Sequence, residues 1–219
     1  MATTSATTTL SRRATGVGLG LTGRTGWRRR ERAVLTAGRT LVAEGLVIGT
    51  VGNVSARHGR ELRITPTRRA YETMRRRDLV RVDSDSGLPL TADAHPSREL
   101  PLHLAVYRAR PDVAAVIHTH SPYATAWSFL DAPLEPALED LDYFGIGPVR
   151  TAAAAPPGSD ALAANVSQAL GGSNAVLLGH HGVLTTGRSV DEALVAARVV
   201  EHQARIAWLV RAPGIAEPL

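Results

Sequence analysis

The sequence predicts a single α/β or α+β domain in which helices cover a sheet. Its 219 residues are enough to bury a sizeable core, and 44% of them are hydrophobic, as in globular proteins. Segments with helical and with strand periodicity mix along the whole chain, and no internal repeat is visible.

The first helix is expected over residues 28–44, where apolar side chains recur at helical spacing. They are Val34, Leu35, Leu41 and Val42. Gly45 then provides a stop signal. Residues 1–26 are rich in Thr, Gly and Arg, and we expect them to form a disordered tail. Their stretch 18–23 fits G-x-G-x-x-G, but no strand precedes it, which favours a flexible linker.

The middle of the chain alternates between extended and helical segments. Residues 46–67 are expected to be extended around a glycine-rich turn, and residues 75–83 to form a short helical start followed by a strand. A helix should follow Pro96 and run to about Arg108. The apolar run that follows predicts a strand over residues 112–120.

The last part continues this alternation. Ser121 as N-cap and Pro122 at the first helical position predict a helix over residues 121–130. The remaining elements are a strand over 145–151, a helix over 159–170 ended by two glycines, two strands within 174–187, and a helix opened by the capping box Ser189-x-x-Glu192 and ending near Val210. We expect one domain over 27–212 and a short C-terminal tail over 213–219.

Charge argues against a nucleic-acid partner. The net charge is +5, but residues 1–32 hold seven arginines and one glutamate, and the remaining 187 residues sum to −1. The basic character therefore belongs to the tail and not to a groove. No apolar run approaches the roughly 18 residues that span a bilayer, and the N-terminus lacks a secretory apolar region. We expect a cytoplasmic protein with no nucleic-acid or membrane partner.

Two histidines end the buried-looking strand 112–120, and they indicate a metal. The chain has no cysteine, so His, Asp or Glu would have to hold any ion. His118 and His120 stand two residues apart, and positions i and i+2 of a strand point to the same side. Two adjacent imidazoles repel when both are charged, whereas coordination uses the neutral ring.

Other candidates surround this pair. His180 and His181 follow a second apolar run, and one of them could complete a three-histidine site with an open position, while the other would be structural. Glu99, at a helix start, could be a fourth ligand, a general base, or both. The glycine-rich turn within residues 49–57 exposes N–H groups, as anion-binding turns do.

The stretches GNVSAR, ITPT, PSRELPLHLAVYRARPDVAAVIHTH and LLGHHG occur in this order. Together they resemble the class II aldolase/adducin family, which includes L-fuculose-1-phosphate aldolase and L-ribulose-5-phosphate 4-epimerase. The resemblance covers about residues 28–210. It implies a central, mostly antiparallel sheet covered by helices on both sides, and a homotetramer with sites near subunit interfaces.

The resemblance also implies roles for particular residues. The metal ligands would be Glu99, His118, His120 and His181, and Glu99 would also serve as the base. The substrate phosphate would be held by Asn53, Thr67 and Ser97, with Thr50 and Gly52 beside them. The ion would most often be Zn, with Mn or Co as alternatives. The implied reaction cleaves a ketose phosphate to dihydroxyacetone phosphate and an aldehyde through a metal-stabilised enediolate.

Three positions depart from the family pattern. Arg68 replaces a glycine and Arg98 replaces a serine in the expected phosphate site. These arginines could bind phosphate, fill the pocket, suit a carboxylate, or point to solvent. Glu139 or Asp140 stands where the aldolases carry a tyrosine, and Tyr143 follows.

Two alternatives to an aldolase therefore stay open. One is a decarboxylase or dehydratase that acts on a sugar-acid or sugar phosphate at the same metal site. Release of carbon dioxide would distinguish the decarboxylase from the aldolase. The other is a non-catalytic, adducin-like binding module, which would have no need of a complete ligand set. His103, on the helix after Glu99, is expected to pack behind the site.

Overall fold

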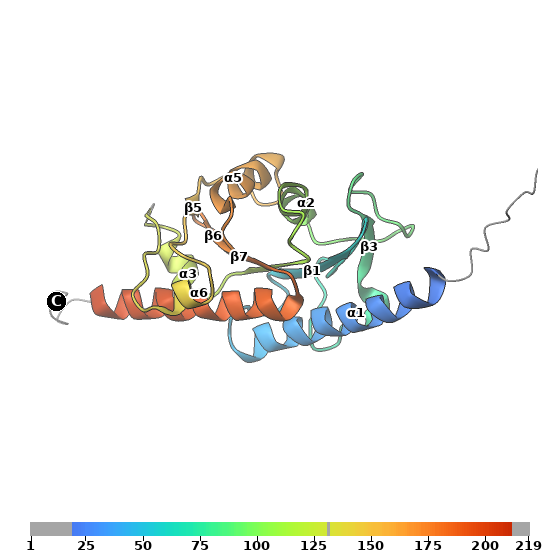
Figure 1. Cartoon of the computed structure of the whole chain (residues 1–219), viewed down its shortest axis with the longest axis horizontal. Helices are drawn as coiled ribbons and strands as arrows, with labels where there is room; N and C mark the ends of the chain where they lie inside the picture. The colour runs from blue at the N-terminus through green and yellow to red at the C-terminus, as the bar shows by residue number, and fades with distance from the viewer. Residues whose placement is uncertain (1–18, 131, 212–219) are drawn as a thin grey trace, which may run out of the picture.

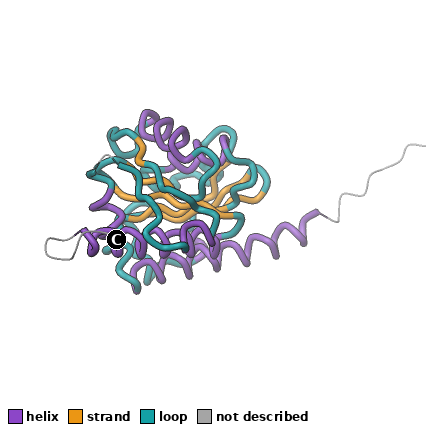
Figure 2. The backbone as a smooth tube through the Cα atoms, turned by 60° about the vertical axis from the view of Figure 1, so that its left-hand side comes forward, coloured by secondary structure: helices purple, strands orange, loops and turns teal. Residues whose placement is uncertain are grey.

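The computed structural model describes residues 19–130 and 132–211. The expected C-terminal tail, 213–219, and residues 1–18 of the expected N-terminal tail lie outside the described residues. Figures 1 and 2 show a sheet sandwiched between helices on both faces. No helix within the described part of the chain combines the length and apolar character needed to cross a membrane.

Seven strands of the described residues form one sheet in the order β3-β2-β1-β4-β7-β6-β5. Their bounds are β1 (Asn53–His58), β2 (Glu61–Ile64), β3 (Val80–Asp83), β4 (Ala115–Thr119), β5 (Thr151–Ala152), β6 (Ala175–Leu178) and β7 (Gly182–Gly187). Only β5 and β6 pair in parallel among these strands, and the other neighbours are antiparallel. The mostly antiparallel sheet is thus confirmed.

The helices divide between the two faces of the sheet. Their bounds are α1 (Leu19–Ala43), α2 (Leu100–Ala109), α3 (Pro122–Trp127), α4 (Asp140–Tyr143), α5 (Asp160–Leu170) and α6 (Val190–Arg211), with a 3-10 turn at Arg76–Asp78. Helices α2 and α5 cover one face, and α1 and α6 run along the other (Figure 1). This arrangement confirms the expectation of helices on both sides.

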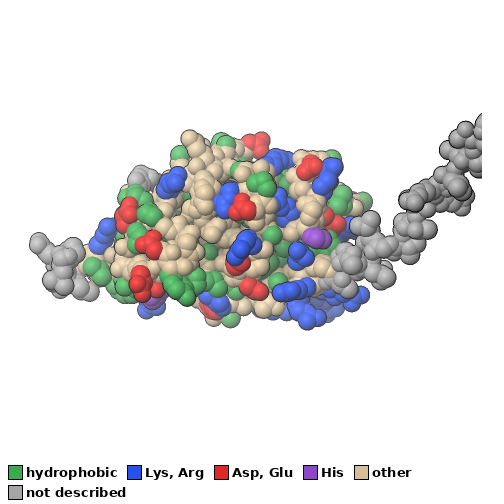
Figure 3. Space-filling view, viewed as in Figure 1, with side chains coloured by type: hydrophobic (Ala, Val, Ile, Leu, Met, Phe, Trp, Pro, Cys, Tyr) green, Lys and Arg blue, Asp and Glu red, His purple; other side chains and the backbone are tan. Residues whose placement is uncertain are grey.

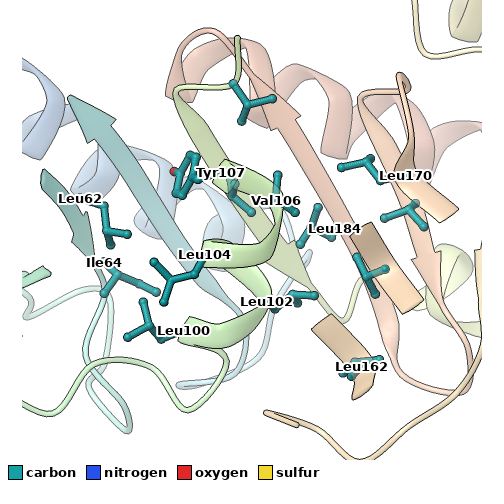
Figure 4. Packing of buried hydrophobic residues seen from close by; sticks show 14 of the residues in the cluster. Leu62, Ile64, Leu100, Leu102, Leu104, Val106, Tyr107, Leu162, Leu170 and Leu184 are labelled. Atoms are coloured by element: carbon teal, nitrogen blue, oxygen red, sulfur yellow. The ribbon is translucent and has the colours of Figure 1, made fainter. Parts of the chain in front are cut away.

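Strand alternation sends neighbouring side chains of β4 into different cores. Val116 packs with α2 and α5 in a cluster that includes Leu104 and Leu184 (Figure 4), because its side chain lies on that face. The side chain of Ile117 points the other way and joins the cluster beneath α1 and the start of α6. A central strand that is fully buried on both faces explains the continuous apolar run before His118.

The first helix is longer than expected. It begins at Leu19, so residues 19–26, which we expected to lie in the disordered tail, are helical. The part of 18–23 that is described is helical too, which rules out the flexible-linker interpretation there. Exposed arginines, among them Arg28, Arg29 and Arg32, line this helix. Figure 3 shows Lys and Arg side chains gathered over this end of the molecule.

Other boundaries shift for identifiable reasons. The helix after Pro96 starts at Leu100, because residues 95–97 are extended and pair with residues 65–67. The expected strand 145–151 is reduced to Thr151–Ala152, although Val149 exchanges two backbone hydrogen bonds with Leu134. The short helix α4 was not expected.

Of the two predicted helix caps, one is made by another residue and the other is only half formed. Ser121 precedes α3 but makes no side-chain cap. The Glu201 carboxylate instead accepts from the N–H groups of Tyr123 and Ala124, at 3.0 and 2.9 Å. In the Ser189–Glu192 box the serine accepts from the Glu192 N–H, but the glutamate accepts from Arg188.

Candidate active site

A cavity of about 460 Å³ opens where β4 ends and β7 begins. It brings together residues from five separate segments of the sequence. Its lining consists of Thr50, Val51, Gly52, Asn53, Pro66, Thr67, Arg68, Ser97, Arg98, Glu99, His120 and His181. All seven residues expected to contact substrate are in this list, and the sequence analysis missed only Val51 and Pro66.

His118 does not line the cavity; it is fully buried beside two residues that do, Glu99 and His120. Its Nδ1 lies 3.0 Å from the carbonyl oxygen of Val183 on the neighbouring strand. Because a carbonyl only accepts, Nδ1 carries the proton and donates it. Nε2 is then left with a lone pair, the arrangement typical of metal-ligating histidines.

Three imidazoles converge on one point. The rings of His118, His120 and His181 lie 4.8–4.9 Å apart, centroid to centroid. Nε2 of His120 is 3.0 Å from Nε2 of His118, and one candidate ligand atom from each ring falls within 4.8 Å of the others. Strand periodicity predicted the first pair correctly, and the turn before β7 supplies the third ring.

Glu99 closes the group. Its Oε2 lies 3.2 Å from Nε2 of His118, and its Oε1 lies 3.3 Å from Nε2 of His181. Burial pushes the pKa of this carboxyl up, but its electrostatic interaction with His118, a hydrogen bond from Asn53 and its interaction with His181 outweigh burial and lower it. The carboxylate is therefore ionised and available to a cation.

The rings of His120 and His181 are neutral at pH 7. Burial lowers the pKa of His120 to about 4, and a positive charge on His118 or His181 would act in the same direction. Burial also lowers the pKa of His181 to about 4, helped by His118 and Arg98. Three imidazoles with converging ring nitrogens, beside an ionised carboxylate, form a donor set that fits a divalent ion.

Backbone conformation decides which histidine of the second pair enters the site. His180 adopts a left-handed conformation, with φ of +59°. Its ring packs on Phe129 at 4.8 Å, and its N–H donates to the carbonyl of Ser128. His181 is therefore turned inward. The prediction that the other histidine of this pair is structural therefore concerns His180.

Glycines allow the strands to approach this closely. A Cβ on Gly182 would overlap the carbonyl of Thr119 and touch the rings of His118 and His120. Gly52 has φ of +73°, and a Cβ there would lie 2.7 Å from the carbonyl oxygen of His118. Both positions demand glycine because the metal-site strand runs directly against them.

The two arginines that depart from the family pattern lie at the rim of the cavity, and both are exposed. Arg68 has φ of +54°. This conformation suits glycine, and it costs an L-residue about 1–2 kcal/mol.

The residues that stand where the aldolases carry a tyrosine lie outside this cavity. Glu139 and Asp140 stand at the start of α4. Tyr143 lines a different cavity together with Phe144 and Arg188. None of residues 139–144 is among the described residues that line the cavity at Glu99.

Comparison with known proteins agrees with this geometry. A family model described as "Class II Aldolase and Adducin N-terminal domain" matches residues 32–208. The 5-methylthioribulose-1-phosphate/5-deoxyribulose-1-phosphate aldolase of Rhodospirillum rubrum is 35% identical over 185 residues, which cover 84% of this chain and 82% of that protein. The L-fuculose phosphate aldolase of Haemophilus influenzae is 35% identical over 80% of each chain.

Solved structures agree as well. An L-fuculose 1-phosphate aldolase superposes with a TM-score of 0.80 at 32% identity, covering 87% of this chain and 89% of its own. The L-fuculose-1-phosphate aldolase of Thermus thermophilus superposes with a TM-score of 0.77 at 27% identity, covering 88% and 99%.

Proposed function

The chain belongs to the class II aldolase and adducin family, and from this premise we propose that it is a divalent-metal-dependent aldolase. Its substrate would be a ketose 1-phosphate, either fuculose-1-phosphate-like or a deoxypentulose 1-phosphate. The products would be dihydroxyacetone phosphate and an aldehyde. Relatives named for both substrate types support this class.

The observation that carries the proposal is the position of Glu99. A buried, ionised carboxylate lies 3.2 and 3.3 Å from two of three converging imidazoles, at the wall of an open cavity. A binding module has no need of such a group, because a buried carboxylate costs free energy unless it is paired. A lyase needs a base at this place.

The residues divide the chemistry between them. His118, His120, His181 and Glu99 would hold the ion, which when bound supplies a Lewis acid for the negative charge that develops on the substrate oxygens. Cleavage of the C3–C4 bond releases the proton of the C4 hydroxyl as the aldehyde forms and requires a proton at C3. Glu99 would take up a proton and deliver it to C3, and in the condensing direction it would remove that proton. The turn at Thr50–Asn53, with Thr67 and Ser97, would hold the phosphate through N–H and O–H donors.

Arg68 and Arg98 would add charge to this phosphate site. The left-handed backbone of Arg68 supports a use for its guanidinium, since glycine would fit there without strain. In Arg68→Gly we expect stability to rise by about 1 kcal/mol while KM for the phosphorylated sugar increases. Urea unfolding and steady-state kinetics would measure the two effects, and an unchanged KM would place the arginine in solvent.

The direct test is a product assay on a panel of ketose 1-phosphates. L-fuculose 1-phosphate, 5-deoxyribulose 1-phosphate and 5-methylthioribulose 1-phosphate would be offered with and without a chelator. Dihydroxyacetone phosphate would be detected by coupled reduction. Chelator-sensitive formation from any of them supports the aldolase, and the best substrate identifies the aldehyde half.

A second candidate uses the same site. Two guanidinium groups at one rim could hold a carboxylate as well as a phosphate, which would suit a decarboxylase of a sugar-acid phosphate. Release of carbon dioxide from such a substrate, without dihydroxyacetone phosphate from the ketose panel, would favour that reaction. Loss of water without carbon loss would favour a dehydratase.

Assembly, metal and compartment complete the proposal. We expect zinc, a homotetramer and a cytoplasmic location. Exposed apolar side chains support association, among them Trp208 and Leu209 at the end of α6, which are 42% and 41% exposed. Light scattering on the purified protein would measure the assembly, and metal analysis would identify the ion.

A further inference from the structure

A chain of buried polar side chains runs from the core to Glu99. The hydroxyl groups of Tyr107 and Ser55 lie 2.7 Å apart, and Ser55 Oγ lies 2.7 Å from Nδ1 of His103. Nε2 of His103 contacts the side-chain oxygen of Asn53. The amide nitrogen of Asn53 donates to Glu99 Oε2 at 2.8 Å.

Helix and strand periodicity bring these residues together. Asn53 and Ser55 are two apart on β1 and share a face, and His103 and Tyr107 are four apart on α2. Asn53 also lies directly opposite His118 in the β1–β4 register. The sequence analysis missed Ser55 and Tyr107, although these two spacings were visible.

The chemistry of the groups fixes the direction of every hydrogen bond. A carboxylate only accepts, so the NH₂ of Asn53 faces Glu99 and the amide oxygen faces His103. That oxygen only accepts, so Nε2 of His103 carries a proton. Nδ1 then accepts from Ser55, and Ser55 accepts from Tyr107.

We infer that His103 is a positioning residue, whose Nε2–H locks the Asn53 side chain with its NH₂ toward Glu99. This inference rests on the proposed role of Glu99 as the base. If the amide were reversed, its oxygen would face Oε2 and repel the carboxylate. With the amide held in place, Oε2 is engaged and Oε1, which accepts no hydrogen bond from the described residues, is left as the proton acceptor.

The surroundings of His103 suit a fixed, neutral ring. It is fully buried, and burial lowers its pKa to about 3, with the charge of His118 adding to this effect. A neutral ring carries one proton, so only one of its nitrogens can donate. Ser55 occupies the other nitrogen and thereby selects the tautomer that serves Asn53.

Two substitutions separate positioning from packing. The amide of His103→Gln can place an N–H donor near the position of Nε2, whereas that of His103→Asn reaches only as far as Nδ1. At matched metal content we expect His103→Asn to lower kcat by about 10- to 100-fold with little change in KM, and His103→Gln to keep most of the activity. Equal activity in the two variants would overturn the inference.

A second measurement needs no variant and no substrate. Long-range ¹H–¹⁵N correlation spectra of the full-length chain report the tautomer of each histidine. We expect a neutral His103 with its proton on Nε2 between pH 5 and 8, and a proton on Nδ1 would contradict the inference. This readout stays valid if the chain proves not to be an aldolase, so the two failures can be distinguished.

Discussion

The two ends of the β4–β7 strand pair carry two cavities, and the larger one is not the candidate active site. The cavity at the start of β4 measures about 630 Å³ and is lined by Val113, Thr186 and Gly187, among others. The cavity at the end of β4 measures about 460 Å³ and holds Glu99 and His181. Both lie against the same pair of antiparallel strands.

The two cavities differ in how their charged and polar side chains are paired. At the larger cavity Arg110 pairs with Asp112 at 2.7 Å, and Arg188 pairs with Glu192 at 3.2 Å. These charges satisfy one another near the surface, where such pairs contribute little. At the smaller cavity a buried carboxylate faces imidazoles whose ring nitrogens converge. The smaller cavity is therefore the candidate active site because its polar side chains are free to bind a ligand, whereas the charged side chains of the larger cavity pair with one another.

Replacing the carboxylate at each end gives the sharpest contrast. Glu99→Gln should keep the fold and lower kcat/KM by about 10²- to 10⁴-fold, since an amide cannot act as a base. Glu192→Gln, at the other end, should leave kcat/KM unchanged. Steady-state kinetics on the best ketose phosphate would measure both, and full activity in Glu99→Gln would remove this residue as the base.

Replacing one proposed metal ligand and one neighbouring histidine tests the metal site. His120→Ala should weaken zinc binding by at least about 100-fold, because even outer partners of a metal ligand contribute 10- to 100-fold. His180→Asn changes a histidine of the facing turn that points away, and asparagine tolerates its positive φ. Equilibrium dialysis would compare the affinities, and equal loss in both variants would contradict the assignment.

Acid should weaken the fold through His103. Its folded-state pKa of about 3 lies below the usual value of 6.5, so the unfolded chain binds the extra proton between these values. The stabilisation is complete above about pH 6.5 and is lost as pH falls toward 3, by about 1.4 kcal/mol per pH unit. Urea unfolding of the metal-free chain at pH 7, 6, 5 and 4 would measure this slope.

The matched control for the pH slope is His103→Gln, which has no titrating group at this position. Its unfolding free energy should decline less steeply with acid than that of the parent chain. Parallel slopes would show that His103 is not the source of the acid sensitivity.

Alanine substitutions of the glycines at the two ends of β7 should separate an effect on the stability of the fold from an effect on zinc binding. A Cβ on Gly182 would overlap the Thr119 carbonyl, and one on Gly187 would lie 2.6 Å from the Ala193 nitrogen. Each alanine variant should lose about 1–3 kcal/mol through overpacking. Only Gly182→Ala should also weaken zinc binding, and a similar affinity loss in Gly187→Ala would break the contrast between the two ends.

Much of the site followed from local rules. The period of a strand places His118 and His120 on one side, and the lack of cysteine limits the ligands to His and carboxylates. The family motifs, in their order, indicated the sheet and the loops that surround the cavity. Local rules were less successful at boundaries, where the first helix was expected nine residues too late and the strand near Val149 too long.

Other features depended on contacts between distant segments. Sequence patterns alone left open which of His180 and His181 enters the site, because the left-handed turn at His180 is held by packing on Phe129. The Tyr107–Ser55–His103–Asn53 chain also required the register of β1 against β4 and the docking of α2. Such contacts join residues about 50 positions apart, and burial of both faces of the sheet selects them only when the whole chain has folded.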